Sequence, residues 1–146
     1  MNNQRAVNII MIEDDEGHAR LIEKNVRRAG ISNALNHFAD GASAIEYLFE
    51  HKDGPMKNGP ALILLDLNLP DMSGTDILER VKSDPQLKKT PVVVLTTTDD
   101  KLEIQRCYDL GCNVYITKPV NYDSFADAIR QLGLFLSVIK TPEPDD

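Results

Sequence analysis

Short runs of apolar residues limit the folds that this chain can adopt, because such runs leave little room for a polar face. Five such runs occur along the 146 residues: Val7–Ile12, Ala61–Leu65, Pro91–Leu95, Asn113–Thr117 and the weaker Leu35–Phe38. A strand that is apolar on both faces must be covered from both sides, which is typical of a parallel sheet. The runs therefore predict the five strands of a buried parallel sheet.

Helical periodicity occupies the intervals between these runs. Apolar residues recur at spacings of three and four in the segments 19–29, 42–49, 75–82, 102–110 and 121–140. Gly30 and Gly111 follow two of these segments, in the position where helices commonly end. Strands that alternate with helices predict a doubly wound α/β fold with right-handed crossover connections.

The domain organisation follows from the length, which suits one domain. We assign residues 1–140 to this domain and expect the acidic, proline-containing tail 141–146 to fray. The residues after Lys118 are taken up by the fifth helix and the tail, so we expect no separate output domain.

Composition excludes several kinds of partner. The chain carries 16 basic and 23 acidic residues, a formal net charge of −7, whereas a nucleic-acid-binding protein needs clustered Lys and Arg. The apolar runs are far shorter than the about 20 residues of a membrane-spanning helix. We therefore expect no nucleic-acid partner and no membrane segment. Two cysteines, Cys107 and Cys112, make no disulfide framework and indicate the cytoplasm.

Charged and hydroxyl side chains follow four of the predicted strands. They are Glu13–Glu16, Asp66, Thr96–Thr98 and Lys118. In an open α/β sheet the carboxyl ends of the strands share one edge, where ligands bind. Crowded carboxylates repel one another, and an all-oxygen set without a His or Cys cluster suits Mg²⁺. A carboxylate beside Mg²⁺ can accept a phosphoryl group, whose charge a lysine and a threonine hydroxyl would stabilise.

The same residues carry a resemblance to a known family. The motifs are Glu13-Asp14, Leu64–Gly74 around Asp66, Leu95–Thr97 and Tyr115–Pro119. From Val7 to about Leu136, the chain resembles the receiver domain of bacterial two-component response regulators. It most resembles the single-domain regulators that pair with bacterial phytochromes. The resemblance implies the flavodoxin-like (βα)5 fold of five parallel strands, in the order 2-1-3-4-5.

The resemblance also implies a phosphorylation site with a metal. Asp66 would be the phosphoacceptor, and Glu13 and Asp14 would hold Mg²⁺ together with Asp66 and the backbone carbonyl of Asn68. Many receivers have Asp-Asp where this chain has Glu13-Asp14. The pair Asp14 and Asp15 is therefore an alternative, which the position relative to the strand makes less favourable.

Further residues would serve as a switch. Thr96, preferred to its neighbour Thr97, would bond a phosphoryl oxygen, and Lys118 would pair first with the carboxylate and then with the phosphoryl group. Tyr115 would be the aromatic switch, whose ring turns inward once Thr96 moves. Asn68 and Thr98 would flank the phosphoryl group and tune its lifetime.

These roles predict a signalling function. A sensor histidine kinase, of the bacteriophytochrome type on the local resemblance, would phosphorylate Asp66, and the face formed by helix four, strand five and helix five would respond. A downstream phosphotransfer protein is a further expected partner. Apolar residues crowd positions 132–139, which favours a homodimer through the face of strand five and helix five. The chain would phosphorylate and dephosphorylate itself without being a turnover enzyme.

Three other functions are weighed against this one. A haloacid-dehalogenase-type phosphohydrolase needs a second acid two residues after its nucleophile, where this chain has Asn68. A flavodoxin-like flavin carrier needs a phosphate loop after strand one, where Glu13–Glu16 would repel a phosphate. A degenerate receiver that serves only as an interaction module would not keep the complete site.

Four polar residues near the site receive a structural interpretation. Asp15 and Glu16 are expected to favour a helix N-terminus rather than to bind metal. His18 is interpreted as a surface residue, and Asp71 as a turn residue beside Gly74.

Overall fold

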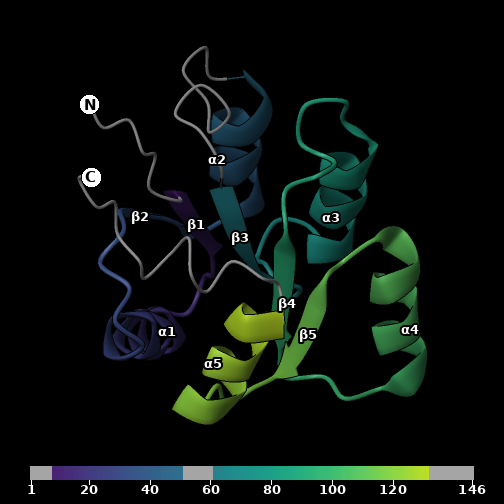
Figure 1. The fold of residues 1–146 in the computed structure, drawn as a ribbon. Helices are drawn as coiled ribbons and strands as arrows, with labels where there is room; N and C mark the ends of the chain where they lie inside the picture. Colours follow the sequence, from purple (N-terminus) through teal and green to yellow (C-terminus); the bar gives the residue numbers. More distant parts are fainter. Residues whose placement is uncertain (1–7, 51–60, 132–146) are drawn as a thin grey trace.

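Five parallel strands form one sheet in the order β2-β1-β3-β4-β5, in a computed structural model that describes residues 8–50 and 61–131 (Figure 1). The elements in chain order are β1 (Asn8–Ile12), α1 (Glu16–Arg28), β2 (Leu35–Phe38), α2 (Gly41–Ile45), η1 (Glu46–Glu50), β3 (Ala61–Asp66), α3 (Gly74–Ser83), β4 (Val92–Thr96), α4 (Lys101–Leu110), β5 (Val114–Thr117) and α5 (Tyr122–Gln131). This is the predicted doubly wound fold, with the predicted strand order.

The sheet is covered on both faces, as the apolar strands require. Alternate residues of the central strands point to opposite sides, so Ile9 and Met11 lie in one buried cluster while Ile10 and Ile12 lie in the other. The first cluster includes side chains of α1 and α5, and the second includes side chains of α2, α3 and α4. Figure 1 shows α1 and α5 on one side of the sheet and α2, α3 and α4 on the other. All six residues of β3 are buried, which puts this strand at the centre of the core.

The helices agree with the predicted segments, with one difference. Helix α1 begins at Glu16, where a helix N-terminus was expected, because the Asp15 carboxylate accepts a hydrogen bond from the His18 N–H at 2.9 Å and caps the first turn. The predicted segment 42–49 is divided into a short α-helix, α2, and a π-helical turn, η1.

The fifth helix runs from Tyr122 to Gln131 in the described part of the chain. The rest of the predicted helix (132–140), the tail 141–146 and the apolar positions that favoured a dimer lie outside the described residues. The domain boundary at residue 140 therefore stays a prediction.

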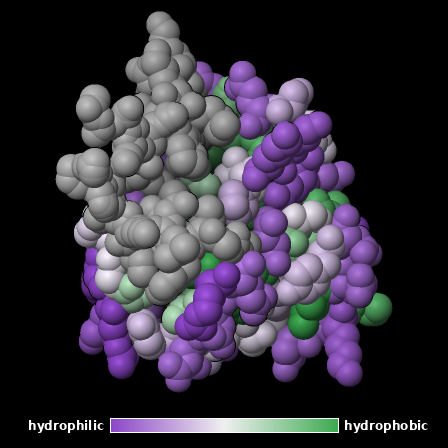
Figure 2. Space-filling view, in the orientation of Figure 1, coloured by the Kyte–Doolittle hydropathy of each residue, from purple (hydrophilic) through white to green (hydrophobic). Residues whose placement is uncertain are grey.

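The surface agrees with the polar composition. Figure 2 shows hydrophilic side chains over most of the described surface on one face of the molecule. Within residues 8–50 and 61–131, no helix has the length and apolar character needed to cross a membrane. Leu102 on α4 is the most exposed large apolar side chain of the described residues, at 81%.

Candidate functional site

The carboxyl ends of β1, β3, β4 and β5 bring the predicted site residues to one edge of the sheet. Strand β3 lies between β1 and β4, and Asp66 is its last residue. The register pairs Ile12 of β1 with Leu65, and Asp66 with Leu95 of β4. Glu13, Asp66 and Thr96 therefore end neighbouring strands at about the same level, and Lys118 follows β5 on the far side of β4.

Three carboxylates form a cluster at this edge. Glu13, Asp14 and Asp66 each offer an oxygen, and these oxygens lie within 4.8 Å of one another. Glu13 and Asp66 are buried, whereas Asp14 is exposed and leaves the cluster open to solvent. Asp15 is not part of the cluster, because it caps α1, as the structural interpretation expected. The geometry therefore favours the pair Glu13 and Asp14 over Asp14 and Asp15.

The cluster fits a hard divalent cation. Mg²⁺ binds oxygen ligands at about 2.1 Å, so ligands on opposite sides of the ion are about 4.2 Å apart. The carboxylate oxygens already lie within 4.8 Å of one another, so only a small side-chain adjustment is needed to hold one ion. All three ligands are carboxylates and none is a thiolate or an imidazole, which suits Mg²⁺ or Mn²⁺ better than zinc.

Lys118 holds the buried carboxylates together. Its side chain is only 6% exposed, and Nζ lies 2.7 Å from Glu13 Oε1 and 3.3 Å from Asp66 Oδ2. The Lys118–Pro119 peptide bond is cis. Burial raises the pKa of the Glu13 carboxyl above its ordinary value, and the charge of Asp66 adds to this, while the hydrogen bond from Lys118 acts in the opposite direction. The ammonium group therefore places one positive charge between two buried carboxyl groups.

Thr96 is fully buried at the end of β4, beside the phosphoacceptor candidate. Its hydroxyl oxygen accepts a hydrogen bond from the Asn68 side-chain amide at 3.3 Å, and the Asn68 N–H donates to Asp66 Oδ1 at 3.1 Å. Thr97 is exposed. These contacts link Asn68 to both Asp66 and Thr96, and they favour Thr96 over Thr97 as the residue that faces the site.

Tyr115 on β5 and Thr98 after β4 are joined to each other by a hydrogen bond. The Tyr115 hydroxyl donates to the backbone carbonyl of Thr98 at 2.9 Å, and burial raises the pKa of Tyr115 to about 12. The Thr98 hydroxyl accepts a hydrogen bond from the Asp100 N–H at 3.2 Å. Both side chains are thus engaged in the segment after β4, and their roles as switch and tuning residue stay predictions.

The sequence did not indicate several residues that support the site. The His18 side chain is 45% exposed, which agrees with a surface residue, but its Nδ1 also lies 3.0 Å from Lys118 Nζ and 3.7 Å from Glu13 Oε2. Asn25 is buried on α1 and donates to the carbonyl of Val120 at 2.9 Å, which fixes the segment after Lys118. Their spacing of seven residues, two helical turns, was the available signal that both lie on one face of α1.

Asp71 has more specific contacts than a turn residue needs, and His37 also contacts the backbone near the site. The Asp71 carboxylate accepts hydrogen bonds from the N–H groups of Gly41 and Ala42, at 2.8 Å and 2.9 Å, and so caps α2 from the loop after β3. Those two bonds lower the pKa of Asp71. A ring nitrogen of His37 lies 2.7 Å from the backbone carbonyl of Glu13. Sequence reasoning found neither contact because both join residues that are distant along the chain.

Known proteins are similar to this chain in sequence and fold. Residues 9–130 match the model of the response regulator receiver domain. Response regulator Rcp1 of Synechocystis is 36% identical over 127 residues, which cover 87% of this chain and 86% of Rcp1. A solved Mn²⁺-bound form of Rcp1 has a TM-score of 0.72 at 32% identity and covers 94% of this chain and 99% of that one.

Two further solved structures are similar over nearly the whole chain. A response regulator receiver domain from Rhodospirillum rubrum is 63% identical, with a TM-score of 0.76, and the match covers 96% of this chain and all of the other. The bacteriophytochrome response regulator RtBRR is 37% identical, with a TM-score of 0.80, and covers 95% of this chain and 85% of its own. With its acidic cluster and buried lysine at the carboxyl edge of the sheet, the chain belongs to the response regulator receiver family.

Proposed function

We propose that Asp66 accepts a phosphoryl group from the phosphohistidine of a sensor histidine kinase, with Mg²⁺ held by Glu13, Asp14 and Asp66. The backbone carbonyl of Asn68 would be a further ligand. One observation carries the proposal: Lys118 Nζ lies 3.3 Å from Asp66 Oδ2, next to carboxylate oxygens grouped within 4.8 Å. The carboxylate that we propose as the nucleophile thus lies beside the candidate cation site and the Lys118 ammonium group.

The transfer balances as a substitution at phosphorus. An oxygen of Asp66 forms a bond to phosphorus while the P–N bond of the donor phosphohistidine breaks. The imidazole nitrogen leaves with the electron pair. Lys118 can then donate to a phosphoryl oxygen, and the Thr96 hydroxyl can donate to another once it turns from Asn68. When bound, Mg²⁺ would neutralise the negative charge that develops on the phosphoryl oxygens.

Removal of the phosphoryl group from Asp66 needs only water as a reactant. A water oxygen attacks phosphorus, the bond to Asp66 breaks, and the products are the Asp66 carboxylate and inorganic phosphate. Asn68 and Thr98 lie two residues beyond Asp66 and Thr96, and we propose that they set the rate of this step. Each phosphorylation event then carries one signal, so the domain is a self-modifying switch rather than a turnover enzyme.

The response would reach the face formed by α4, β5 and α5. If Thr96 turns toward the phosphoryl group, it leaves the Asn68 amide that now donates to it at 3.3 Å. Tyr115 would then break its 2.9 Å bond to the Thr98 carbonyl and turn inward. Leu102 and Tyr108, exposed at 81% and 44%, supply apolar contact area on α4. We propose that this face binds a downstream phosphotransfer protein and that β5 and α5 form a homodimer.

Similar proteins support the proposed kinase partner and the proposed Mg²⁺ ion. RtBRR is named a bacteriophytochrome response regulator, and we propose a phytochrome-type kinase as the phosphoryl donor here. Rcp1 has been solved with Mn²⁺, which prefers the same oxygen ligands as Mg²⁺. We also propose a cytoplasmic location, which the two free, buried cysteines support.

Labelling with a small phosphodonor tests the proposal. Incubation with acetyl phosphate and Mg²⁺ should add one phosphoryl group per chain by intact-mass spectrometry, and EDTA should prevent it. Asp66→Asn should abolish labelling. Asp76→Asn, which changes an exposed acid on α3, should retain it. Labelling that survives in Asp66→Asn, or sustained release of phosphate over many turnovers, would contradict the proposal.

A further inference from the structure

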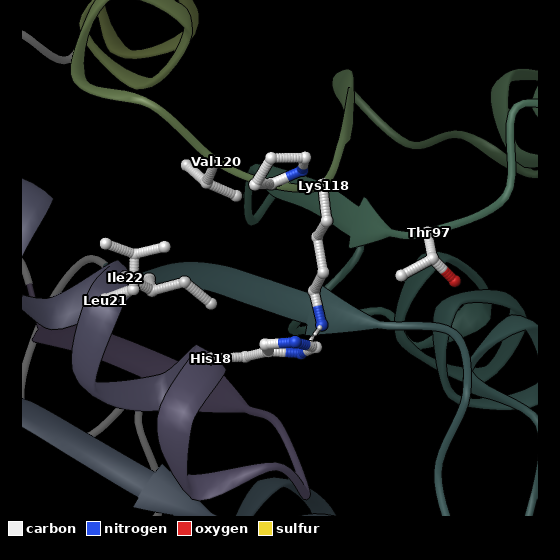
Figure 3. A pocket seen from close by; sticks show the side chains of 7 residues that line it. His18, Leu21, Ile22, Thr97, Lys118 and Val120 are labelled. Atoms are coloured by element: carbon white, nitrogen blue, oxygen red, sulfur yellow. Dashed lines mark hydrogen bonds between the residues drawn. The ribbon is translucent and has the colours of Figure 1, made fainter.

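The first turn of α1 places an imidazole against the lysine of the site. Asp15 accepts a hydrogen bond from the His18 N–H at 2.9 Å, which fixes the backbone of His18 at the start of the helix. From there the ring reaches Lys118, and Nδ1 lies 3.0 Å from Nζ. Figure 3 shows the imidazole directly beside the lysine amino group.

The Lys118 ammonium group has three protons and three acceptors. Nζ lies 2.7 Å from Glu13 Oε1, 3.0 Å from His18 Nδ1 and 3.3 Å from Asp66 Oδ2. An ammonium group can only donate, so His18 Nδ1 is the acceptor in a hydrogen bond between the two groups. Because the N–H bonds of an ammonium group are tetrahedral, two short bonds to Glu13 and His18 direct the third proton toward Asp66.

Apart from Lys118 and Glu13, whose Oε2 lies 3.7 Å from His18 Nδ1, the described surroundings of the ring are mostly apolar. His18 lines a cavity of about 180 Å³ whose walls include Leu21, Ile22 and Val120. These walls are apolar, and Figure 3 shows the hydroxyl of Thr97 pointing away from the amino group. Without the imidazole, the third proton of the ammonium group would face the cavity.

We propose that His18 is a positioning residue for phosphoryl transfer, which holds the Lys118 ammonium group beside Asp66. The inference rests on the proposed function of Asp66. Glu13 also belongs to the candidate metal site, so its bond to Lys118 competes with a bound cation. The bond to His18 does not compete in this way. His18 therefore keeps Lys118 in place when Glu13 turns to a metal.

Two substitutions separate the hydrogen bond from the shape of the side chain. In His18→Asn, the side-chain oxygen takes the place of Nδ1 and can accept from Lys118. In His18→Leu, no acceptor remains. With saturating Mg²⁺, the rate constant for phosphorylation by acetyl phosphate should fall about three- to tenfold in His18→Leu, the effect of one ordinary hydrogen bond. It should stay within about twofold in His18→Asn, on the same principle.

A structural role alone would not produce this pattern. Calorimetry of Mg²⁺ binding must show that both variants are saturated at the concentration used, because His18 also lies 3.7 Å from Glu13 of the candidate metal site. Equal rates in His18→Leu and the wild type would overturn the proposal, as would an equal loss in His18→Asn and His18→Leu. A wild-type chain that takes no label would instead refute the proposed function of Asp66.

Nitrogen NMR of the imidazole gives a readout that does not depend on phosphorylation. At pH 8.5, the His18 ring should be the Nε2–H tautomer, with Nδ1 unprotonated and hydrogen-bonded. Lys118→Met should shift the Nδ1 resonance, because the donor is lost. The positioning role would be overturned if the ring carries its proton on Nδ1, or if Lys118→Met leaves the Nδ1 resonance unchanged. Either result would count against it even if Asp66 is phosphorylated.

Discussion

Removing the Lys118 charge should destabilise the metal-free protein strongly at neutral pH and weakly in acid. In Lys118→Met, Glu13 and Asp66 lose their common cation. Glu13 Oε1 and Asp66 Oδ2 both lie within 3.3 Å of Lys118 Nζ, so these two oxygens are at most about 6 Å apart. With an effective dielectric constant of about 20, two unit charges at this distance repel by about 3 kcal/mol. Breaking a buried ion pair typically costs about 3–5 kcal/mol, so we expect a loss in this range.

The pH dependence of this loss of stability shows whether unpaired carboxylate charge causes it. Burial already raises the pKa of Glu13, and Lys118 opposes that rise, so the substitution should raise this pKa further. A carboxyl whose folded-state pKa is raised gives stability that is fully present below its ordinary value of 4.5 and is lost as the pH rises through the folded-state value. The difference between variant and wild type should therefore grow from pH 4 to pH 8.

Urea unfolding in EDTA, followed by circular dichroism, measures both effects. Lys82→Met is the matched control, because Lys82 Nζ also donates to three oxygens, of Lys88, Thr90 and Asn113, and none of these is charged. Its effect should not vary between pH 4 and pH 8. Mg²⁺ should restore more stability to Lys118→Met than to the wild type, since it replaces the missing charge. A loss in Lys118→Met that is the same at pH 4 and pH 8, or that Mg²⁺ leaves unchanged, would refute the reasoning.

Three other substitutions or conditions test different parts of the fold. Asn25→Leu removes the donor to the Val120 carbonyl and should lower the unfolding free energy by about 1–3 kcal/mol in urea, because a carbonyl is left without its partner. Gly74→Ala would place a Cβ against the backbone of Asp66 and should both destabilise the protein and slow its phosphorylation. Cys112, whose pKa burial raises to about 12, should react with a thiol reagent only after unfolding, and stability should fall as the pH rises from 9 toward 12.

Each of these three predictions has a control variant or an outcome that would contradict it. Gly30→Ala has open space around its new Cβ, so it should cost stability only through the φ of +86° and should leave phosphorylation unchanged. If the Gly74→Ala protein is phosphorylated at the wild-type rate, the site tolerates displacement of the Asp66 backbone and this prediction is wrong. Loss of stability in Asn25→Leu that Asn25→Ala does not share would point to overpacking, and fast labelling of Cys112 in the folded state would contradict its burial.

The fold was predictable because its strongest signals are local. Ala61–Leu65 is apolar without interruption, and the structure buries every residue of β3. The weaker run Leu35–Phe38 lies at the edge of the sheet, where β2 pairs only with β1, and it has no fully buried residue. The π-helical turn η1 was not predicted, because apolar spacing alone does not distinguish α- from π-helical hydrogen bonding.

The site was predictable as a set of strand ends but not as a set of contacts. Glu13, Asp66 and Lys118 each follow an apolar run, so their convergence follows from a parallel sheet. The hydrogen bonds from Asn25 to Val120 and from Lys118 to His18 join residues 95 and 100 positions apart. Such pairs depend on how α1 packs against α5 and the segment after β5, which no local pattern of the sequence encodes.

The two loops beside the phosphoacceptor differ in how firmly they are tied to their neighbours. The loop after β3 is anchored at both ends, since Asp71 caps α2 and the Gly74 N–H donates to the Leu67 carbonyl at 2.8 Å. The loop after β4 is mostly exposed, and a tyrosine hydroxyl from the neighbouring strand holds one of its carbonyls. The loop after β3 thus has more hydrogen-bonded anchors than the loop after β4. We therefore expect a change at Asp66 to displace the loop that leads to α4 more readily than the loop that leads to α3, even before a partner is bound.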